Sequence, residues 1–311
     1  LFMGIHHLAI DGVSWRIFLE DFTRTIENLQ AGIPVTLPEK ATSYRQWTEA
    51  LEAYASSSAL EGEYRYWKKV IKNFKPLPVD TEYAETISYE DTNTYNVSLD
   101  ATATESLLKD IHGAYGTEIN DVLLSALSIA LHGWVDSDKV VIGLEGHGRE
   151  ELFDGIDINR TLGWFTTVYP VSLDIAPKEE VGTLIADTKD MLRAIPDKGI
   201  GYSVLRYLGK AEVQETLNVD YQEIIFNYLG SFDNSVSKAE KSLVGFAGES
   251  AGESISKTNK NPHRIAINSI VTNNTLQLDW SYDSKRYHKE TIQTIADNYI
   301  AALQHIISHC N

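Results

Sequence analysis

The order of strand-like and helix-like segments constrains the fold of this chain more than any other feature of the sequence. Alternating or continuous apolar runs bounded by turn residues predict strands. The last two such runs flank the turn-forming pair Asn273-Asn274, which predicts a hairpin. We expect strands at residues 95–99, 140–144, 168–173, 223–228, 263–272 and 275–283.

Apolar residues at helical spacing predict the helices that separate these strands. Ser14 is the expected N-cap of the first helix, and Thr102 with Glu105 forms an expected capping box. Because strands and helices alternate irregularly, we expect a layered α/β or α+β fold rather than a doubly wound sheet. The expected helices are 15–31, 44–54, 60–71, 103–111, 120–135, 181–194 and 287–309.

The remaining segments predict how the chain is organised. Residues 1–5 are mostly apolar and predict a buried strand that leads into a pair of histidines. Residues 76–92 are polar, acidic and proline-containing, and they predict a crossover between two lobes. Segment 234–261 is rich in Ser, Gly, Lys and Glu, which predicts a mobile surface loop.

The composition excludes several classes of protein. The formal net charge is -17, so we expect neither nucleic-acid binding, which needs basic surface, nor docking on an anionic membrane. No apolar run approaches the roughly 20 residues that a membrane helix needs. The single cysteine, Cys310, excludes an intrachain disulfide and a cysteine-based zinc site, and it fits a cytoplasmic location.

Two adjacent histidines near the start of the chain form the first candidate site. His6 and His7 precede Asp11 and Gly12, and histidine titrates near neutral pH, which suits proton transfer. On a strand, one histidine would face a cavity and the other would pack inward. Asp11 either orients a histidine base or binds the backbone N–H groups of a turn. Adjacent histidines converge poorly on one ion, so we expect no metal site.

The second candidate is the run Glu145-Gly146-His147-Gly148-Arg149-Glu150, which directly follows a predicted buried strand. A carboxylate such as Glu145 at a strand end beside a cleft suits acid–base chemistry, and the flanking glycines permit close backbone approach. The alternative is a surface loop in which Arg149 pairs with Glu150 or Glu151.

Two further stretches combine aromatic residues with glycine. Residues 160–166 include Trp164 and Thr166, and residues 226–233 include Asn227 and Tyr228. Each stretch is either part of a site or a turn whose aromatic residues belong to the core, and the residues alone leave both interpretations open.

Together these stretches resemble the condensation-domain superfamily of non-ribosomal peptide synthetases, which has the chloramphenicol-acetyltransferase-like fold. The run His6-His7-x-x-x-Asp11-Gly12 is similar to the superfamily signature. Its continuation through Arg16 resembles an epimerization domain in particular. Four further stretches resemble motifs of that subfamily and occur in the same order as in the family. They are residues 145–150, 160–166, 196–202 and 226–233.

The resemblance implies two acetyltransferase-like lobes around a central tunnel. Residues 1–75 would be the end of the N-terminal lobe, which carries the histidine motif, and residues 76–311 the C-terminal lobe with its crossover and bridging elements. Family members carry a substantial segment before the histidine motif, so we expect an incomplete N-terminal lobe here. That segment would also hold the arginine partner of Asp11.

The resemblance also implies a reaction and its partners. The domain would convert the Cα of an aminoacyl or peptidyl thioester from L to D by removing the α-proton and returning it. The thioester would be carried on the 4′-phosphopantetheine arm of a peptidyl carrier protein, among neighbouring synthetase domains, and the domain itself would bind no cofactor. The catalytic residues would be His7, Glu145 and Tyr228. Supporting residues would be His6, Asp11, Gly12, Asn227, Arg149, Trp164 and Thr166.

Two alternatives belong to other functional classes. A condensation domain would form a peptide bond between two carrier-bound substrates, and it would share His7 and Asp11 but need no second proton-transfer carboxylate. A truncated, non-catalytic module would only dock a carrier protein. Glu145 in its glycine-rich setting favours epimerization over condensation, and the presence of His7, Glu145 and Tyr228 argues against a non-catalytic module.

Overall fold

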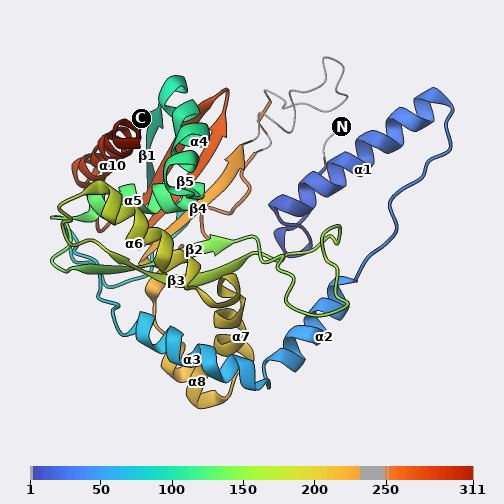
Figure 1. Cartoon of the computed structure of the whole chain (residues 1–311), viewed down its shortest axis with the longest axis horizontal. Coiled ribbons are helices and arrows are strands. Elements are labelled where there is room, and N and C mark those ends of the chain that lie inside the picture. Colours follow the sequence, from blue (N-terminus) through green and yellow to red (C-terminus); the bar gives the residue numbers. More distant parts are fainter. Residues whose placement is uncertain (1–2, 232–248, 251, 311) are drawn as a thin grey trace.

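The computed structural model describes residues 3–231, 249–250 and 252–310, and a mixed six-stranded sheet forms its centre (Figure 1). The strands are β1 Thr92–Leu99, β2 Lys139–Gly146, β3 Thr167–Asp174, β4 Ile224–Ser231, β5 Ile265–Thr272 and β6 Thr275–Asp283. They lie in the order β1-β6-β5-β4-β2-β3. The pairs β2–β4 and β4–β5 are parallel, and the other neighbouring pairs are antiparallel.

Helices precede, separate and follow these strands. The α-helices are α1 Gly12–Ala31, α2 Tyr44–Tyr54, α3 Ser58–Ile71, α4 Ala101–Tyr115, α5 Ile119–Leu131, α6 Val181–Arg193, α7 Ile200–Leu208, α8 Ala211–Leu217 and α10 Lys289–Cys310. Short 3₁₀ turns are η1 His7–Ala9, η2 Tyr89–Asp91, η3 Pro196–Gly199 and η4 Tyr221–Glu223. Within the described residues, no helix is both long enough and apolar enough to cross a membrane.

The helices pack in two groups around the sheet. The long helix α10 contacts α4, α5 and α6 and also packs on β1 and β6, whereas α3 and α7 pack against β3 (Figure 1). Helix α1 extends beyond the sheet (Figure 1), and only Ser14 and Ile17 of its side chains are buried. The predicted layered mixed α/β fold is therefore confirmed.

One continuous core joins the sheet to helices from both parts of the sequence. Fully buried side chains include Trp67 from α3, Phe226 from β4, Trp280 from β6 and Tyr299 from α10, and all four belong to the same hydrophobic cluster. The predicted division of the chain near residue 75 into two lobes stays a prediction.

The parallel pairing of β2 and β4 brings two sequence-distant strand ends together. Leu144 pairs with Phe226, and both side chains are buried. Glu145 and Asn227, the next residue of each strand, therefore lie at the same edge of the sheet, where the carboxyl ends of parallel strands meet.

Two predicted helix starts are wrong by one turn or less. Asp11, rather than Ser14, caps α1, because the Asp11 carboxylate accepts a hydrogen bond from the Ser14 backbone N–H at 2.7 Å. Asp100 caps α4 by accepting from the Ala103 N–H at 2.9 Å. The expected capping-box residue Glu105 instead forms an ion pair with Lys109 one turn later.

The predicted strand at residues 1–5 is wrong for the residues that the structure describes. Residues 3–6 have no regular secondary structure, and Ile5 is 40% exposed. A strand needs a partner for its backbone groups, and the described sheet contains no strand before Thr92. Most of the predicted mobile loop 234–261 lies outside the described residues.

The hairpin between β5 and β6 generates a stability prediction. Asn273 and Asn274 have φ values of 51° and 56°, the left-handed pair that a two-residue type I′ turn requires. Replacement Asn274→Val should lower the free energy of unfolding by about 1–2 kcal/mol, since a β-branched side chain fits this region poorly. Asn274→Gly should preserve or raise it. Urea unfolding of the three proteins measures the difference, and equal midpoints for the Val and Gly variants would contradict this account.

Candidate active site

A cavity of about 530 Å³ lies at the carboxyl ends of β2 and β4. Its walls come from these two strand ends, the beginnings of α1 and α5, and the turn η3. This volume is within the roughly 300–1,000 Å³ of typical small-ligand sites. Of the predicted site residues, those that line the cavity are His7, Asp11, Gly12, Glu145, Thr166, Asn227 and Tyr228.

Glu145 is the carboxyl group of the cavity wall whose pKa is raised. It is the penultimate residue of β2 and is half-buried. Burial raises the pKa of Glu145, and the nearby charge of His7 acts in the opposite direction. The two groups thus line one cavity and interact electrostatically.

His7 begins the 3₁₀ turn η1 rather than lying on a strand. The His6 Nδ1 atom accepts a hydrogen bond from the Leu8 N–H at 3.1 Å and so caps this turn. The ring of His7 packs against Trp164, with centroids 5.3 Å apart. Both histidines are exposed, so the expectation that one of them packs inward is wrong, because a turn does not alternate its side chains as a strand does.

Asp11 anchors the histidine turn to a distant segment. Its carboxylate accepts hydrogen bonds from the backbone N–H groups of Ser14, at 2.7 Å, and Phe165, at 3.0 Å. Its own N–H donates to the carbonyl of Gly163 at 3.1 Å. Of the two roles considered for Asp11, these bonds support the one in which it binds backbone N–H groups.

Arg149 completes this buried network. Its guanidinium lies 3.3 Å from the Asp11 carboxylate and donates to the Ser14 hydroxyl at 2.8 Å. It also donates to the carbonyls of Ile158, at 2.7 Å, and Thr161, at 2.8 Å. Each of the charged side chains is at most 5% exposed, so the interaction is little screened by solvent.

The Asp11–Arg149 pair bears on two expectations. Within this chain, the partner of Asp11 comes from the segment after β2, and an arginine partner from a segment before the histidine motif stays a prediction. Arg149 does not form the surface pair expected with Glu150 or Glu151. Instead His147 lies 3.3 Å from the carboxylate of Glu150.

The chemistry of Asp11 follows from its surroundings. Burial favours the neutral acid, but the backbone and hydroxyl hydrogen bonds and the charge of Arg149 outweigh it, and together they lower the pKa of Asp11. Asp11 is therefore an ionised structural group at neutral pH and is poorly suited to accept a proton in catalysis.

Gly148 shows why glycines follow Glu145. Its φ is +66°, and an added Cβ would lie 1.7 Å from the carbonyl oxygen of Phe165. The loop after β2 thus lies directly against the segment that Asp11 and Arg149 hold. Glycine is the residue that fits both the left-handed backbone and the contact.

The end of β4 supplies the neighbouring part of the wall. Tyr228 is half-buried, and burial raises the pKa of its phenol, an effect that the charge of Arg16 opposes. The carbonyl of Asn227 accepts a hydrogen bond from the Ser269 hydroxyl at 3.1 Å. Tyr228 is therefore a neutral phenol that can donate a hydrogen bond in the cavity.

Three of the predicted site residues do not line the cavity. They are His6, Arg149 and Trp164, and they support the wall through the contacts already described. Trp164 is also 42% exposed.

Sequence reasoning missed several residues that line the cavity. Arg193 binds both carboxylate oxygens of the buried Asp121, at 2.9 and 2.8 Å. Arg16 donates to the carbonyl of Leu229 at 3.1 Å. Tyr169 and Lys198 also contribute to the wall. For Lys198 a signal was present, since it belongs to the stretch 196–202 that resembles a family motif.

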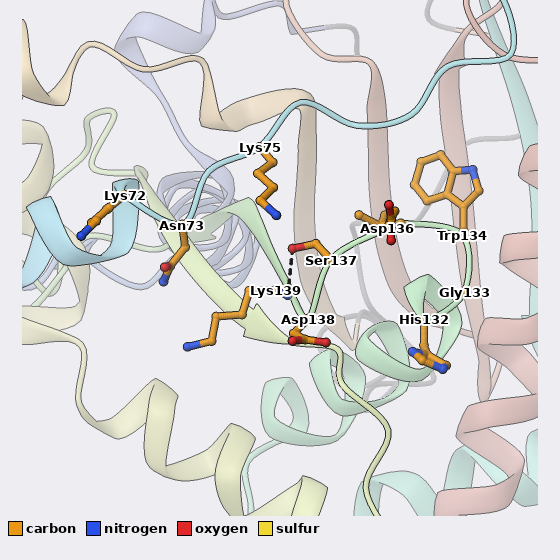
Figure 2. A pocket seen from close by; sticks show the side chains of 11 residues that line it. Lys72, Asn73, Lys75, His132, Gly133, Trp134, Asp136, Ser137, Asp138 and Lys139 are labelled. Carbon is orange, nitrogen blue, oxygen red and sulfur yellow. Dashed lines mark hydrogen bonds between the residues drawn. The ribbon is translucent and has the colours of Figure 1, made fainter.

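A second hollow, of about 750 Å³, lies at the opposite end of β2 around Lys139 (Figure 2). Its lining combines exposed lysines and aspartates from the end of α3 and from the loop between α5 and β2. Figure 2 shows Lys72 and Lys139 extending to one side, away from Trp134 and His132. These charged groups do not converge on one point, so the cavity at Glu145 is the better candidate.

Comparisons with known proteins connect the whole chain to one family. The condensation-domain family model matches residues 1–311. Gramicidin S synthase 1 of Brevibacillus brevis is 38% identical over 318 residues, which cover 100% of this chain and 29% of that protein. Bacitracin synthase 2 of Bacillus licheniformis is 37% identical over 310 residues, which cover 100% of this chain and 12% of that protein. The chain thus spans a small part of these relatives.

Comparison with solved structures leads to the same family. The epimerization domain from the third module of tyrocidine synthetase B is 37% identical with a TM-score of 0.89, and the match covers 98% of this chain and 68% of that one. The first condensation domain of the calcium-dependent antibiotic synthetase is 18% identical with a TM-score of 0.68, over 98% of this chain and 63% of that one. The latter match concerns the fold alone. The predicted resemblance to the superfamily is confirmed.

The buried ion pair generates a second prediction. Asp11→Ala should lower the free energy of unfolding by about 3–5 kcal/mol, because it leaves the Arg149 charge buried without a partner. Asp21→Ala is the matched control, since Asp21 on the same helix pairs with Arg160 near the surface and should lose about 1 kcal/mol or less. Equal losses in the two variants, measured by urea unfolding at pH 7, would contradict the assignment.

The same pair sets a pH dependence. The pKa of Asp11 is lowered in the folded state, so its stabilisation is present above the unfolded pKa of about 3.9 and disappears as the pH falls through the folded value. The stability difference between the wild type and Asp11→Ala should therefore shrink as the pH falls below about 4. A difference that stays constant from pH 7 to pH 3 would contradict this.

Proposed function

Because this chain belongs to the condensation-domain family, we propose that it epimerizes the Cα of an aminoacyl or peptidyl thioester in peptide synthesis. Its relatives include synthases of peptide antibiotics. The structure with a TM-score of 0.89 is an epimerization domain, and this match favours epimerization among the reactions of the family.

One observation carries the proposal: Glu145, with a pKa raised by burial, shares a cavity with His7. Inversion at Cα needs proton-transfer groups that reach both faces of the carbon, or one mobile group. A carboxyl whose pKa is raised toward neutrality exchanges protons more effectively than an ordinary one. Condensation of two substrates has no need of this second carboxyl group.

The proposed reaction leaves the composition of the substrate unchanged, because one proton leaves Cα and one proton returns. The thioester carbonyl acidifies the α-proton, and one of the two groups, Glu145 or His7, removes it. The electron pair of the broken C–H bond enters the enolate, and a proton returns to Cα from the opposite face. Tyr228 and Asn227 line the cavity, and in this proposal the Tyr228 phenol and the Asn227 amide donate to the enolate oxygen, where negative charge develops.

Partners and location belong to the same proposal. The thioester would enter on the 4′-phosphopantetheine arm of a peptidyl carrier protein, with neighbouring synthetase domains on either side of the chain. The chemistry uses side chains alone, so the domain would bind no cofactor of its own. A cytoplasmic location stays a prediction.

Deuterium exchange tests the reaction. In deuterated water, an L-aminoacyl-phosphopantetheinyl carrier protein incubated with this chain should gain deuterium at Cα and yield D-residue, measured by mass spectrometry and chiral chromatography after thioester cleavage. Glu145→Gln should slow this exchange about 100-fold or more, the usual contribution of a positioned acid–base group. Glu150→Gln is the matched control, because Glu150 lines the same cavity paired with His147, and it should change the rate little.

Two other outcomes would assign a different function to this chain. Peptide formation after adding a second loaded carrier, without exchange at Cα, would identify a condensation domain. Carrier binding without either reaction would identify a docking module.

The pH–rate profile provides an independent check. If ionised Glu145 is the base, the acidic limb of the exchange rate should lie above the ordinary glutamate pKa of about 4.3, because burial raises the pKa of Glu145. The same raised pKa means that ionisation of Glu145 opposes folding as the pH rises. Glu145→Gln should therefore raise Tm at pH 8, and a lower Tm would show that the carboxylate is needed for folding instead.

A further inference from the structure

The turn η3 has a backbone conformation that side chains rarely adopt. Asp197 and Lys198 have φ values of 41° and 50°, and Gly199 follows with a φ of 86°. Three consecutive left-handed residues, two of them not glycine, persist only where the surroundings hold them. Lys198 of this turn lines the cavity that contains Glu145.

Buried side chains of α2 and α3 contact this turn through hydrogen bonds. The hydroxyl of Tyr54 lies 2.9 Å from the Asp197 carboxylate and 2.5 Å from the Glu63 carboxylate. Glu63 also accepts a hydrogen bond from the indole N–H of Trp67 at 3.2 Å. Tyr54 is 9% exposed and Glu63 is 8% exposed. The polar side chains that α2 and α3 direct at the turn are therefore largely shielded from solvent.

The geometry of these contacts favours one additional proton. A phenol carries a single hydrogen, so Tyr54 can donate to only one of its two carboxyl neighbours. Asp197 is exposed to solvent and Glu63 is buried, which places the additional proton on Glu63. Burial together with the charge of Asp197 raises the pKa of Glu63, in keeping with this order. With both carboxyl groups ionised, Tyr54 donates to either of them. With Glu63 protonated, Glu63 donates to Tyr54 and Tyr54 donates to Asp197.

Tyr169 connects this turn to the strand that carries Glu145. A Cβ added to Gly199 would lie 2.0 Å from the Tyr169 ring, and one added to Gly146 would lie 3.3 Å from the same ring. The ring is thus enclosed between the turn and the residue after Glu145. The carbonyl oxygen of Lys198 lies 3.8 Å from the Gly146 Cβ position, so the turn and the end of β2 are also close directly.

We propose that the Tyr54–Glu63–Asp197 network is a positioning device for the proposed reaction. It holds the left-handed turn against Tyr169, and Tyr169 fixes Gly146 and thereby the Glu145 carboxyl in the cavity. Tyr54, Glu63 and Asp197 touch no reacting atom and act through the turn. This inference rests on the proposed role of Glu145.

The test compares tyrosine variants that differ only in what their hydroxyl contacts. Tyr54→Phe removes both bonds of the network, whereas Tyr64→Phe on α3 removes a hydroxyl that has no hydrogen bond among the described residues. Glu63→Gln supplies an amide that can donate to Tyr54 and accept from Trp67, so it reproduces the protonated acid, and Glu63→Ala does not. Each variant is assayed for kcat and KM of deuterium incorporation at Cα and for amide exchange of residues 196–201.

Tyr54→Phe and Glu63→Ala should lower kcat about tenfold or more with KM nearly unchanged, since small misplacements of a reacting group cost large factors in rate. The same variants should exchange the amides of residues 196–201 faster. Glu63→Gln and Tyr64→Phe should match the wild type in both measurements. A wild-type kcat in Tyr54→Phe, or a Glu63→Gln variant as defective as Glu63→Ala, would overturn the proposal.

A measurement that needs no turnover separates this inference from the proposed function. Carbon-13 NMR of labelled glutamate carboxyls follows the titration of Glu145, which Glu145→Gln assigns. In Tyr54→Phe the pKa of Glu145 should move away from its wild-type value, because its burial depends on the turn. If the wild type fails to exchange deuterium, the proposed reaction is wrong. An unchanged pKa of Glu145 in Tyr54→Phe would overturn the positioning network whether or not exchange occurs.

Discussion

The buried ion pair between Asp11 and Arg149 is the interaction on which the candidate site depends. It joins residues 138 positions apart in the sequence, and its hydrogen bonds fix the turn before α1 against the segment that precedes β3. His7 is placed by the first of these segments and packs on Trp164 from the second. Without the pair, the histidine turn would lack its attachment to the strand end that carries Glu145.

The surroundings of Asp11 and Glu145 give these two carboxyl groups different properties. Asp11 is surrounded by donors that lower its pKa, so it remains charged and holds the backbone. Glu145 is desolvated by the cavity wall, which raises its pKa. Two acids in one site thus receive opposite properties from their surroundings, and this division supports the proposed proton transfer by Glu145.

A second group of contacts supports the part of the cavity wall that comes from the turn η3. Tyr54 and Glu63 belong to helices that precede the sheet in sequence, and they reach the turn at Asp197 through hydrogen bonds. Tyr169 lies between this turn and Gly146. The Asp11–Arg149 pair and the Tyr54–Glu63–Asp197 network therefore bracket the end of β2 from two directions.

The sequence by itself determined the type and approximate bounds of most elements, the Asn273-Asn274 hairpin and the family. Hydrophobic periodicity and turn residues are local, so they can be interpreted without knowing which segments meet. Only the tertiary structure decided that Arg149 is the partner of Asp11, that His7 starts a turn instead of ending a strand, and that Tyr54 contacts both Glu63 and Asp197. Each of these depends on contacts between segments distant in sequence, where burial and hydrogen bonding outweigh local preference, and no local pattern encodes which distant residue will supply them.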